Sequence, residues 1–484
     1  MTPSTATAPL QHADIRFIVI GLSITMFLSA LDQTIIAAAL PAIADDLGGF
    51  EAISWVASIY LLTATAVIPL YGKFSDIRGR RTALTIGVAI FVMGSVACAL
   101  APSMGWLIAA RAVQGLGGGG LVSLAQTIIA DIVAPKQRGR YQIYFVSVYL
   151  IASLLGPALG GFFTQHLHWT MIFWINLPLG ALAFFMSNSA LKRLPRHERP
   201  HHLDVLGALL LVAATVTLML ALHDGGTAYS WTSVRILGLL AISMVLWIGF
   251  VWRIHTAREP LIPLSVLGND VVACGTIAAS CGVGAYIGLC IYLPVYFETV
   301  RGMSTSESGL SLIPLMVGAV IGATISGQLL GRITHYKRVP IIGLFFAIIG
   351  AIVLMLWADS LTLIAFEAII VVISFGLGTV LPTATVAIQN AMEPHQLGTA
   401  TGTMNFFRQL SAALTVSIFG ALLNASDIGG DTLNSTISIP PGSFSLIFAA
   451  TAIGFMIALV SMLWMKEYPL RSVTHQSGDV TVVA

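Results

Sequence analysis

Fourteen long apolar runs follow one another along this chain of 484 residues, and each is about long enough to cross a lipid bilayer as a helix. Only 9% of the residues are charged, whereas a soluble domain carries about 25%. A transmembrane barrel would instead show runs of about ten residues that alternate in polarity. The sequence therefore predicts an all-α polytopic membrane protein. The expected spans are 17–39, 54–72, 82–101, 105–130, 141–164, 169–190, 204–222, 234–252, 270–297, 309–331, 339–358, 361–389, 399–423 and 443–465.

The basic residues are divided unevenly between the two sides that these runs define. If the N-terminus is inside, 19 of the 23 lysines and arginines fall in cytoplasmic segments, because Arg235 and Arg301 lie outside and Arg111 and Arg408 lie within spans. Lysine and arginine favour cytoplasmic loops. We expect a multi-pass protein of the cell (inner or plasma) membrane with both termini in the cytoplasm, its first run being a retained span rather than a removable signal peptide.

Two matches at one spacing indicate that the chain consists of two related halves. Gly72 opens a basic loop after the second span, and Gly331 opens another 259 residues later. The turn PKQRG at 135–139 recurs at the same offset as PHQLG at 394–398. Some transporters are built from such repeats. We expect a cytoplasmic N-terminus (1–16), a six-helix bundle (17–190), a cytoplasmic linker with two inserted spans (191–268), a second six-helix bundle (269–467) and a cytoplasmic tail (468–484).

Ionisable side chains inside spans are costly and are therefore candidates for function. Asp32 lies about 15 residues into the first span and Arg111 about 6 residues into the fourth, which runs the other way. Both belong at a similar depth in the outer half of the membrane. Opposite charges at matched depth predict a pair. It is either a structural ion pair or a proton site, because a buried carboxylate gains or loses a proton as its surroundings change.

The second half carries two further ionisable residues within its spans. Glu367 lies about six residues into the twelfth span, and Arg408 lies near the middle of the thirteenth. Glu367 is either a functional acid or a solvated group at the outer interface. Three other acids, Asp131, Asp270 and Glu298, lie at span ends, where solvent or a loop arginine satisfies them.

The sequence lacks the motifs of nucleotide-binding, catalytic and metal-binding sites. A phosphate-binding P-loop needs a lysine after its glycines, and the run GGGG at 117–120 has none, so we interpret it as a place of close helix approach. No nucleophile–base–acid set, metal-ligand cluster or intramembrane histidine is present. We expect no enzymatic activity, no cofactor, no metal and no nucleic-acid partner. Energy for uphill transport would come from an ion gradient.

The loop between the second and third spans reads GKFSDIRGRR at residues 72–81. This motif resembles the signature loop of the major facilitator superfamily. In that resemblance Gly72 and Gly79 permit a tight backbone, and Asp76 bonds helix N-terminal amides or a facing arginine. Asp131 is placed to join a conformational latch, whose residues would be Gly72, Asp76, Arg78, Gly79, Arg80 and Asp131. In the second half His335 stands where Asp76 would.

Three further segments extend this resemblance. RAVQG at 111–115 is similar to the fourth-helix motif associated with proton transfer, which adds Gln114 to the candidates. GPALGG at 156–161 resembles the antiporter motif, in which Gly156, Pro157, Gly160 and Gly161 allow bending and close packing. LDQTIIAAALP at 31–41 resembles the first-helix motif of the fourteen-span drug:proton antiporters, except that Ala37 replaces a frequent asparagine. WINLP at 174–178 fits the same subfamily.

The resemblance spans roughly residues 14–467 and implies a secondary active transporter that works by alternating access between two six-helix bundles plus two extra central helices. The implied activity is proton-coupled export of amphipathic or cationic organic compounds, by a monomer in contact with the bilayer. The candidates for coupling are Asp32, Arg111, Gln114, Glu367 and Arg408. The alternative is a transporter of one defined metabolite, such as a vitamin, siderophore or amino acid, including in the uptake direction. A non-transporting sensor is disfavoured because it has no need to bury charge.

Overall fold

A computed structural model describes residues 12–191, 203–226, 228–426 and 442–471, and these are almost entirely helical. Residues 1–11 of the expected N-terminus, 192–202 of the expected linker and 472–484 of the expected tail lie outside the described residues. The elements are α1 (His12–Leu47), η1 (Phe50–Ala52), α2 (Ile53–Arg78), α3 (Arg80–Ala99), α4 (Met104–Gly118), α5 (Leu121–Ile132), α6 (Pro135–His166), α7 (Met171–Trp174), α8 (Asn176–Leu191), α9 (Val205–Asp224), α10 (Val234–Thr256), α11 (Leu264–Leu267), α12 (Asp270–Thr299), α13 (Thr305–Leu310), α14 (Ile313–Leu329), α15 (Arg338–Trp357), α16 (Leu363–Ala391), η2 (Pro394–Gln396), α17 (Leu397–Ser426) and α18 (Ser443–Trp464).

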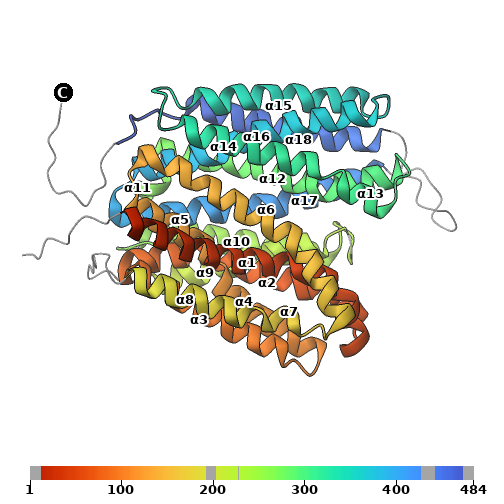
Figure 1. Cartoon of the computed structure of the whole chain (residues 1–484), viewed down its shortest axis with the longest axis horizontal. Coiled ribbons are helices and arrows are strands. Elements are labelled where there is room, and N and C mark those ends of the chain that lie inside the picture. The colour runs from red at the N-terminus through yellow and green to blue at the C-terminus, as the bar shows by residue number, and fades with distance from the viewer. Residues whose placement is uncertain (1–11, 192–202, 227, 427–441, 472–484) are drawn as a thin grey trace, which may run out of the picture.

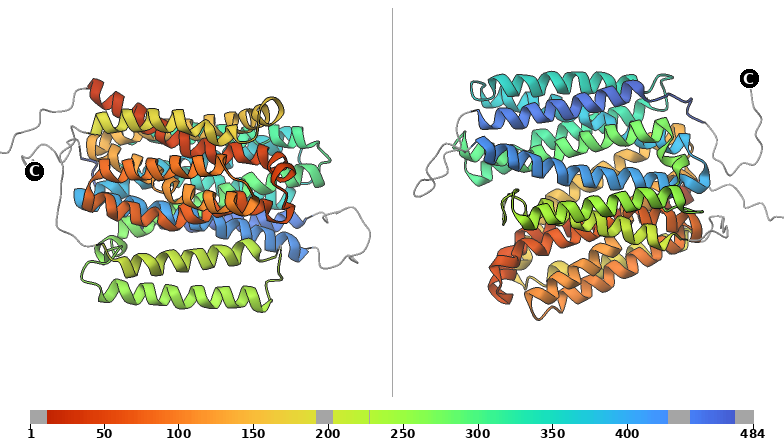
Figure 2. Two further views of the ribbon diagram at one scale, coloured as in Figure 1. Left: turned by 90° about the horizontal axis from the view of Figure 1, so that it is seen from below. Right: turned by 180° about the vertical axis from the view of Figure 1, so that it is seen from behind.

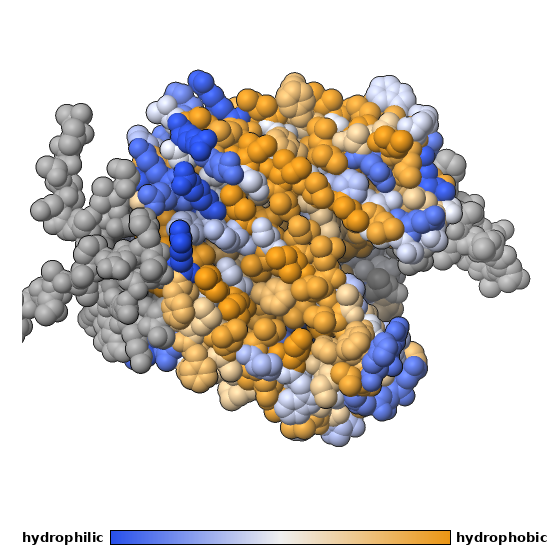
Figure 3. Space-filling model, viewed as in Figure 1, coloured by the Kyte–Doolittle hydropathy of each residue, from blue (hydrophilic) through white to orange (hydrophobic). Residues whose placement is uncertain are grey.

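Fourteen helical stretches in the described part of the chain are long and apolar enough to cross a membrane, which confirms the predicted number. The fourth span is a composite of α4 and α5, which are separated at Gly119 and Gly120. Figure 3 shows that apolar residues cover the middle of the face in view and that polar residues gather towards its two ends. This is the surface expected of a protein that spans the hydrocarbon core.

The helices run back and forth between two ends of the molecule. The start of α1 and the end of α18 lie at the same end, on the left in Figure 1. The loop after α2, the turn into α6 and the loop after α14 also lie there, with the basic residues of 73–81, 135–140 and 332–338. We call this the basic end, and the other the opposite end.

The long helices form two bundles, which we call the N half (α1–α8) and the C half (α12–α18). In Figure 1 the C half lies above the N half. Within the N half α1 packs on α6 and α8, and α3 on α4; within the C half α14 packs on α16, and α12 on α17. The halves meet mainly where α2 contacts α17 and where α6 contacts α14.

The two inserted helices, α9 and α10, lie on one flank of the bundles rather than between them (Figure 2). α10 packs on α9, and α9 contacts both α2 and α17. The ring of Trp55 in α2 meets that of His223 in α9 at 4.7 Å between centroids, and Trp247 in α10 meets Phe406 in α17 at 6.2 Å. The inserted pair is therefore central in the sequence but peripheral in space, and it touches both halves along the α2–α17 seam.

The halves approach each other most closely at the basic end, through glycines. A Cβ atom on Gly72 would lie 2.5 Å from the carbonyl oxygen of Gly398, and one on Gly331 would lie 2.4 Å from that of Lys136. Gly398 lies 259 residues after Gly139, which is in the same turn as Lys136, and Gly331 lies 259 residues after Gly72. Each half thus offers equivalent positions to the other, as parallel repeats would.

Candidate functional site

The two charges expected at matched depth in the first and fourth spans are in direct contact. Arg111 Nη1 on α4 donates to Asp32 Oδ2 on α1 at 2.6 Å. Both side chains are only 1% exposed. The predicted pair is thus present and sealed from solvent in this conformation.

The carboxylate of Asp32 is fully satisfied by donors. Its Oδ1 atom accepts from Gln114 Nε2 at 2.8 Å and from Asn176 Nδ2 at 3.0 Å. Arg111 also donates through Nη1 to Gln114 Oε1 at 2.8 Å and through Nε to the carbonyl oxygen of Val56 at 3.0 Å. Four helices, α1, α2, α4 and α8, therefore hold one buried charge pair, and all four belong to the N half.

Asn176 is a member of this cluster that the sequence interpretation did not single out. It is the first residue of α8, and its Nδ2 atom also donates to Ser95 Oγ on α3 at 3.0 Å. Its Oδ1 atom has no hydrogen-bond partner among the described residues. The WINLP segment supported only the subfamily resemblance, although a lone amide in an apolar run was a signal for the site.

Tyr60 on α2 covers the pair. Its ring lies over the Arg111 guanidinium, with 4.4 Å between the guanidinium carbon and the ring centroid. Its hydroxyl lies 3.3 Å from Ser29 Oγ. A Cβ atom on Gly118 would come within 2.3 Å of that hydroxyl, so the glycine run leaves the space that the tyrosine fills. Cation–π contact with a desolvated guanidinium adds roughly 2 kcal/mol of attraction.

Two further polar side chains near the middle of their helices belong to opposite halves, Arg408 on α17 and Tyr149 on α6. Tyr149 on α6 is within electrostatic range of Tyr60 on one side and of Arg408 on α17 on the other. Its side chain is 37% exposed although it sits in the middle of α6.

Glu367 is not part of this arrangement. It is half-buried in the second turn of α16 and makes no hydrogen bond or ion pair with the described residues. The structure therefore does not bring it together with Asp32 or Arg408.

A second polar cluster joins the halves at the basic end. Asp76 Oδ1 accepts from the backbone N–H of Gly398 at 3.0 Å, and Oδ2 accepts from the backbone N–H and the hydroxyl of Thr399 at 2.7 and 2.6 Å. Gly398 and Thr399 open α17, whose first N–H groups have no partner within the helix. The carboxylate thus caps a helix of the other half and favours its positive dipole end.

Arg80 organises this latch from the N half. It donates to Asp76, through Nε to Asp131 Oδ2 at 2.8 Å, and through Nη2 to the carbonyl oxygen of Pro394 at 3.2 Å. Gly79, with φ of 88°, makes the turn between α2 and α3 that brings Arg80 back over α2. Arg78, also expected in the latch, is exposed and makes no hydrogen bond or ion pair with the described residues.

The corresponding place in the C half uses different chemistry. His335, which replaces the aspartate, lies 3.3 Å from Glu467 Oε2, and the backbone N–H of Lys337 donates to Glu467 Oε1 at 3.0 Å. These contacts stay within the C half. Among the described residues, the aspartate-based latch between the halves therefore has no counterpart in this loop.

Two of the four antiporter-motif residues pack against α1. A Cβ atom on Gly156 would lie 2.1 Å from Thr34 Oγ1, and one on Gly160 would lie 2.6 Å from the carbonyl oxygen of Ile35. Gly161 has no atom within 4 Å of such a Cβ, and Pro157 is exposed, so these two face away from α1. The close α1–α6 contact holds α1, and with it Asp32, against the helix that carries Tyr149.

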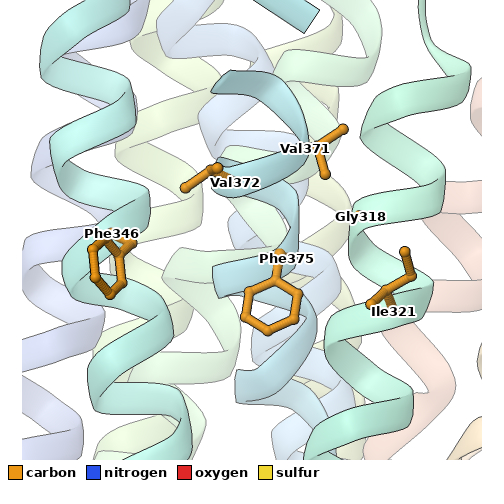
Figure 4. Close-up of a pocket in the computed structure, with 6 residues that line it drawn as sticks. All are labelled: Gly318, Ile321, Phe346, Val371, Val372 and Phe375. Atoms are coloured by element: carbon orange, nitrogen blue, oxygen red, sulfur yellow. The ribbon is translucent and has the colours of Figure 1, made fainter. Parts of the chain in front are cut away.

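A hollow of about 300 Å³ lies elsewhere, between α14, α15 and α16 of the C half. Figure 4 shows its lining: Gly318, Ile321, Phe346, Val371, Val372 and Phe375. None of these side chains carries a polar atom, and the hollow lies apart from both polar clusters. It suits hydrocarbon contact and plays no part in the candidate site.

Comparison with known families places the chain clearly. The family model described as Major Facilitator Superfamily matches residues 22–416. Multidrug resistance protein 3 of Bacillus subtilis is 34% identical over 437 residues, which cover 90% of this chain and 85% of that protein. The efflux pump dotC of Dothistroma septosporum is 33% identical over 451 residues, covering 90% and 76%.

Solved structures share the fold at low sequence identity. The human organic anion transporter MFSD10 (TETRAN) aligns with a TM-score of 0.66 and 17% identity, covering 94% of this chain and all of that one. A bacterial homologue of the iron transporter ferroportin aligns with a TM-score of 0.64 and 14% identity, covering 94% and 99%.

Proposed function

The chain belongs to the Major Facilitator Superfamily and is a multi-pass membrane transporter rather than an enzyme, and on that premise we propose that it exports amphipathic organic compounds in exchange for protons. The relatives named as a multidrug resistance protein and an efflux pump support export. The fourteen spans found in the described part of the chain agree with the fourteen-span drug:proton antiporters that the sequence resembles. The observation that carries the proposal is the buried Asp32–Arg111 pair.

This pair has the properties that a proton site needs. A carboxylate with one counter-charge and two amide donors is held charged without solvent, at substantial desolvation cost. Any rearrangement that draws Arg111 away leaves a buried unpaired carboxylate, and protonation relieves that cost. Asp32 would therefore alternate between charged and neutral forms as the local packing changes, which is what coupling to a proton gradient requires.

Tyr60 provides a route by which a transported compound affects this pair. The ring lies on Arg111, and the same side chain is within electrostatic range of Tyr149 on α6. A compound that displaces Tyr60 would remove a contact of Arg111 and open the pair to water. Gln114 and Asn176 then position the carboxylate for proton exchange.

The latch at Asp76 determines which end of the transporter is closed in this conformation. The basic end is taken as cytoplasmic, since lysine and arginine favour that side, and both termini then lie in the cytoplasm. With Asp76 capping α17 and Gly72 against Gly398, the halves are closed on the cytoplasmic side. Alternating access would release these contacts when the halves rock, with α2 and α6 turning against α17 and α14. A single chain supplies both halves, so the transporter is proposed to act as a monomer.

Everted membrane vesicles test export directly. An imposed inward-acid gradient should drive uptake of fluorescent amphipathic dyes by vesicles that contain the transporter, and collapse of the gradient with a protonophore should stop it. If every dye equilibrates across the membrane independently of the gradient, the proposal of proton coupling is contradicted. Accumulation only in right-side-out vesicles would favour uptake of a defined metabolite instead.

A further inference from the structure

The chain does not turn away from the molecule after α18. Residues 465–471 continue without helical structure along the basic end, and we call this segment the strap. In Figure 1 it is the dark blue trace that runs down from α18, at the upper left, towards the start of α6. Met465 and Leu470, near its two ends, are 1% and 8% exposed, so the strap is packed onto the protein beneath it.

Hydrogen bonds tie the strap to the C half. The hydroxyl of Tyr336, just before α15, donates to the carbonyl oxygen of Tyr468 at 3.1 Å. Asn390, next to the last residue of α16 and 5% exposed, bonds the strap at two points. Its Nδ2 atom donates to the carbonyl oxygen of Pro469 at 3.2 Å, and its Oδ1 atom accepts from the backbone N–H of Arg471 at 3.4 Å. Because one side-chain amide both donates and accepts here, it fixes the position of the strap along α16.

The strap also reaches the N half. The backbone N–H of Lys136 donates to the carbonyl oxygen of Arg471 at 3.3 Å. Lys136 is the second residue of α6, so its N–H group has no partner within the helix. The strap thus caps a helix of the N half while it stays bonded to the C half. It does so at the α6–α14 seam, in the turn where a Cβ atom on Gly331 would meet the carbonyl oxygen of Lys136.

The two seams at the basic end are related by the repeat of 259 residues, and in each a helix start is capped from the other half. Across the α2–α17 seam, Asp76 caps the start of α17. Across the α6–α14 seam, the equivalent residue His335 contacts Glu467 of the strap, and Arg471 supplies the cap to α6. A neutral carbonyl group stands in for a carboxylate here. The second contact is therefore the weaker one, because hydrogen bonds to a charged acceptor are roughly twice as strong.

We propose that the strap is a second latch of the basic end, which stabilises the closed conformation across the α6–α14 seam. Because it is bonded to the C half along its length, it moves with that half, and the contact with Lys136 breaks when the basic end opens. The proposal rests on the opening and closing of this end in the proposed function. It is independent of proton coupling and of the direction of transport.

Distances between spin labels on the full chain in detergent measure whether the strap keeps this end closed. Labels attached after Gln137→Cys and Thr334→Cys, both at exposed positions, span the α6–α14 seam. Labels attached after Thr334→Cys and Glu393→Cys lie within the C half and serve as a reference. The native cysteines are first replaced by alanine: Cys98, Cys274, Cys281 and Cys290. Neither a gradient nor a transported compound is present, so the result is separate from proton coupling.

Two variants release the strap in different ways. Asn390→Leu removes both side-chain hydrogen bonds and should raise the ratio of long to short distances across the seam about threefold to tenfold, since an ordinary hydrogen bond contributes that much. Leu470→Ala weakens the apolar anchor and should shift the distances in the same direction. The matched control within the strap is Lys466→Gln. It breaks an ion pair with Asp270 in which both side chains are more than half exposed, so it should leave the distances unchanged.

The three variants are measured again on the Asp76→Asn background, where the first latch is weakened and a further shift is easier to detect. Distances across the seam that stay at the parent's values in Asn390→Leu and Leu470→Ala on both backgrounds would overturn the proposal. An equal shift in Lys466→Gln, or a change in the reference pair, would also overturn it. Longer distances in either strap variant, with control and reference unchanged, would support it. That outcome without gradient-driven transport by the parent would retain the strap and reject the proton-coupled function.

Discussion

At the scale of single residues, burial of the Asp32–Arg111 pair makes the effect of a conservative substitution larger than the sequence alone would indicate. An isosteric amide at position 32 looks harmless from the sequence, because Asn fills the same volume. In the structure the N–H₂ group of the asparagine would face either Arg111 or both Gln114 and Asn176, all of which are donors, and Arg111 would be left buried without its counter-charge. Breaking a buried pair in this way costs about 3–5 kcal/mol.

We therefore predict that Asp32→Asn both destabilises the protein and stops gradient-driven transport. The double variant Asp32→Asn/Arg111→Gln, which leaves no unpaired charge, should recover most of the thermal stability but not the coupling. Unfolding temperature in detergent and dye accumulation in vesicles give the two readouts. A double variant that recovers both would make the pair a packing element only.

Some of this cluster was predictable and some was not. Opposite charges at equal depth on two spans were enough to predict that Asp32 meets Arg111. The role of Asn176 was not predicted. The break between α7 and α8 decides which face of the sixth span points at Asp32, and periodicity does not locate that break. The sequence also did not show that Arg80, and not Arg78, would bind Asp76, because this follows from the turn made at the positive φ of Gly79.

At the scale of helices, the latch depends on a carboxylate at a helix N-terminus. Asp76→Asn keeps one oxygen but presents an amide to the N–H and hydroxyl of Thr399, so we expect the closed basic end to lose roughly 2–3 kcal/mol. Transport should fall while membrane insertion is retained. The matched control is Arg78→Gln, on an exposed side chain of the same loop, which should transport normally.

Spin labels placed across the basic end would measure the same latch directly. The Asp76→Asn variant should show a longer and broader distance distribution than the parent or Arg78→Gln. Unchanged distances and transport in Asp76→Asn would leave the loop with no role beyond its effect on membrane orientation.

The α1–α6 contact offers a second prediction at this scale. Gly156→Ala places a methyl group 2.1 Å from the Thr34 hydroxyl, and overpacking of this kind costs about 1–3 kcal/mol. Gly161→Ala, five residues later, meets open space and should change stability by less than about 0.5 kcal/mol. Thermal unfolding of the two variants compares them. Equal stabilities would mean that the helices separate easily at this motif.

At the scale of the whole molecule, the sequence specified the span number because each span must satisfy its own backbone in lipid. It did not specify where the two inserted helices pack. The apolar composition of α9 gives no preferred face, and contacts such as that of Trp247 in α10 with Phe406 show that the pair lines the α2–α17 seam.

Membrane orientation is the prediction that belongs to this scale. Reporter fusions after Arg199 and after Leu470 should both read as cytoplasmic, and one at Gly429 as external. Arg199 and Gly429 lie outside the described residues, so their placement follows from the basic-residue asymmetry alone. An external signal after Leu470 would contradict the orientation of the whole bundle.

The measurement that tests the central claim most directly is proton movement in proteoliposomes containing the purified transporter and a pH-sensitive dye. Addition of a transported compound should produce a proton flux opposite to the compound, and this flux should vanish in Asp32→Asn/Arg111→Gln although the compound still binds. Equal proton flux in the parent and the double variant would place the coupling site elsewhere, with Glu367 as the next residue to examine.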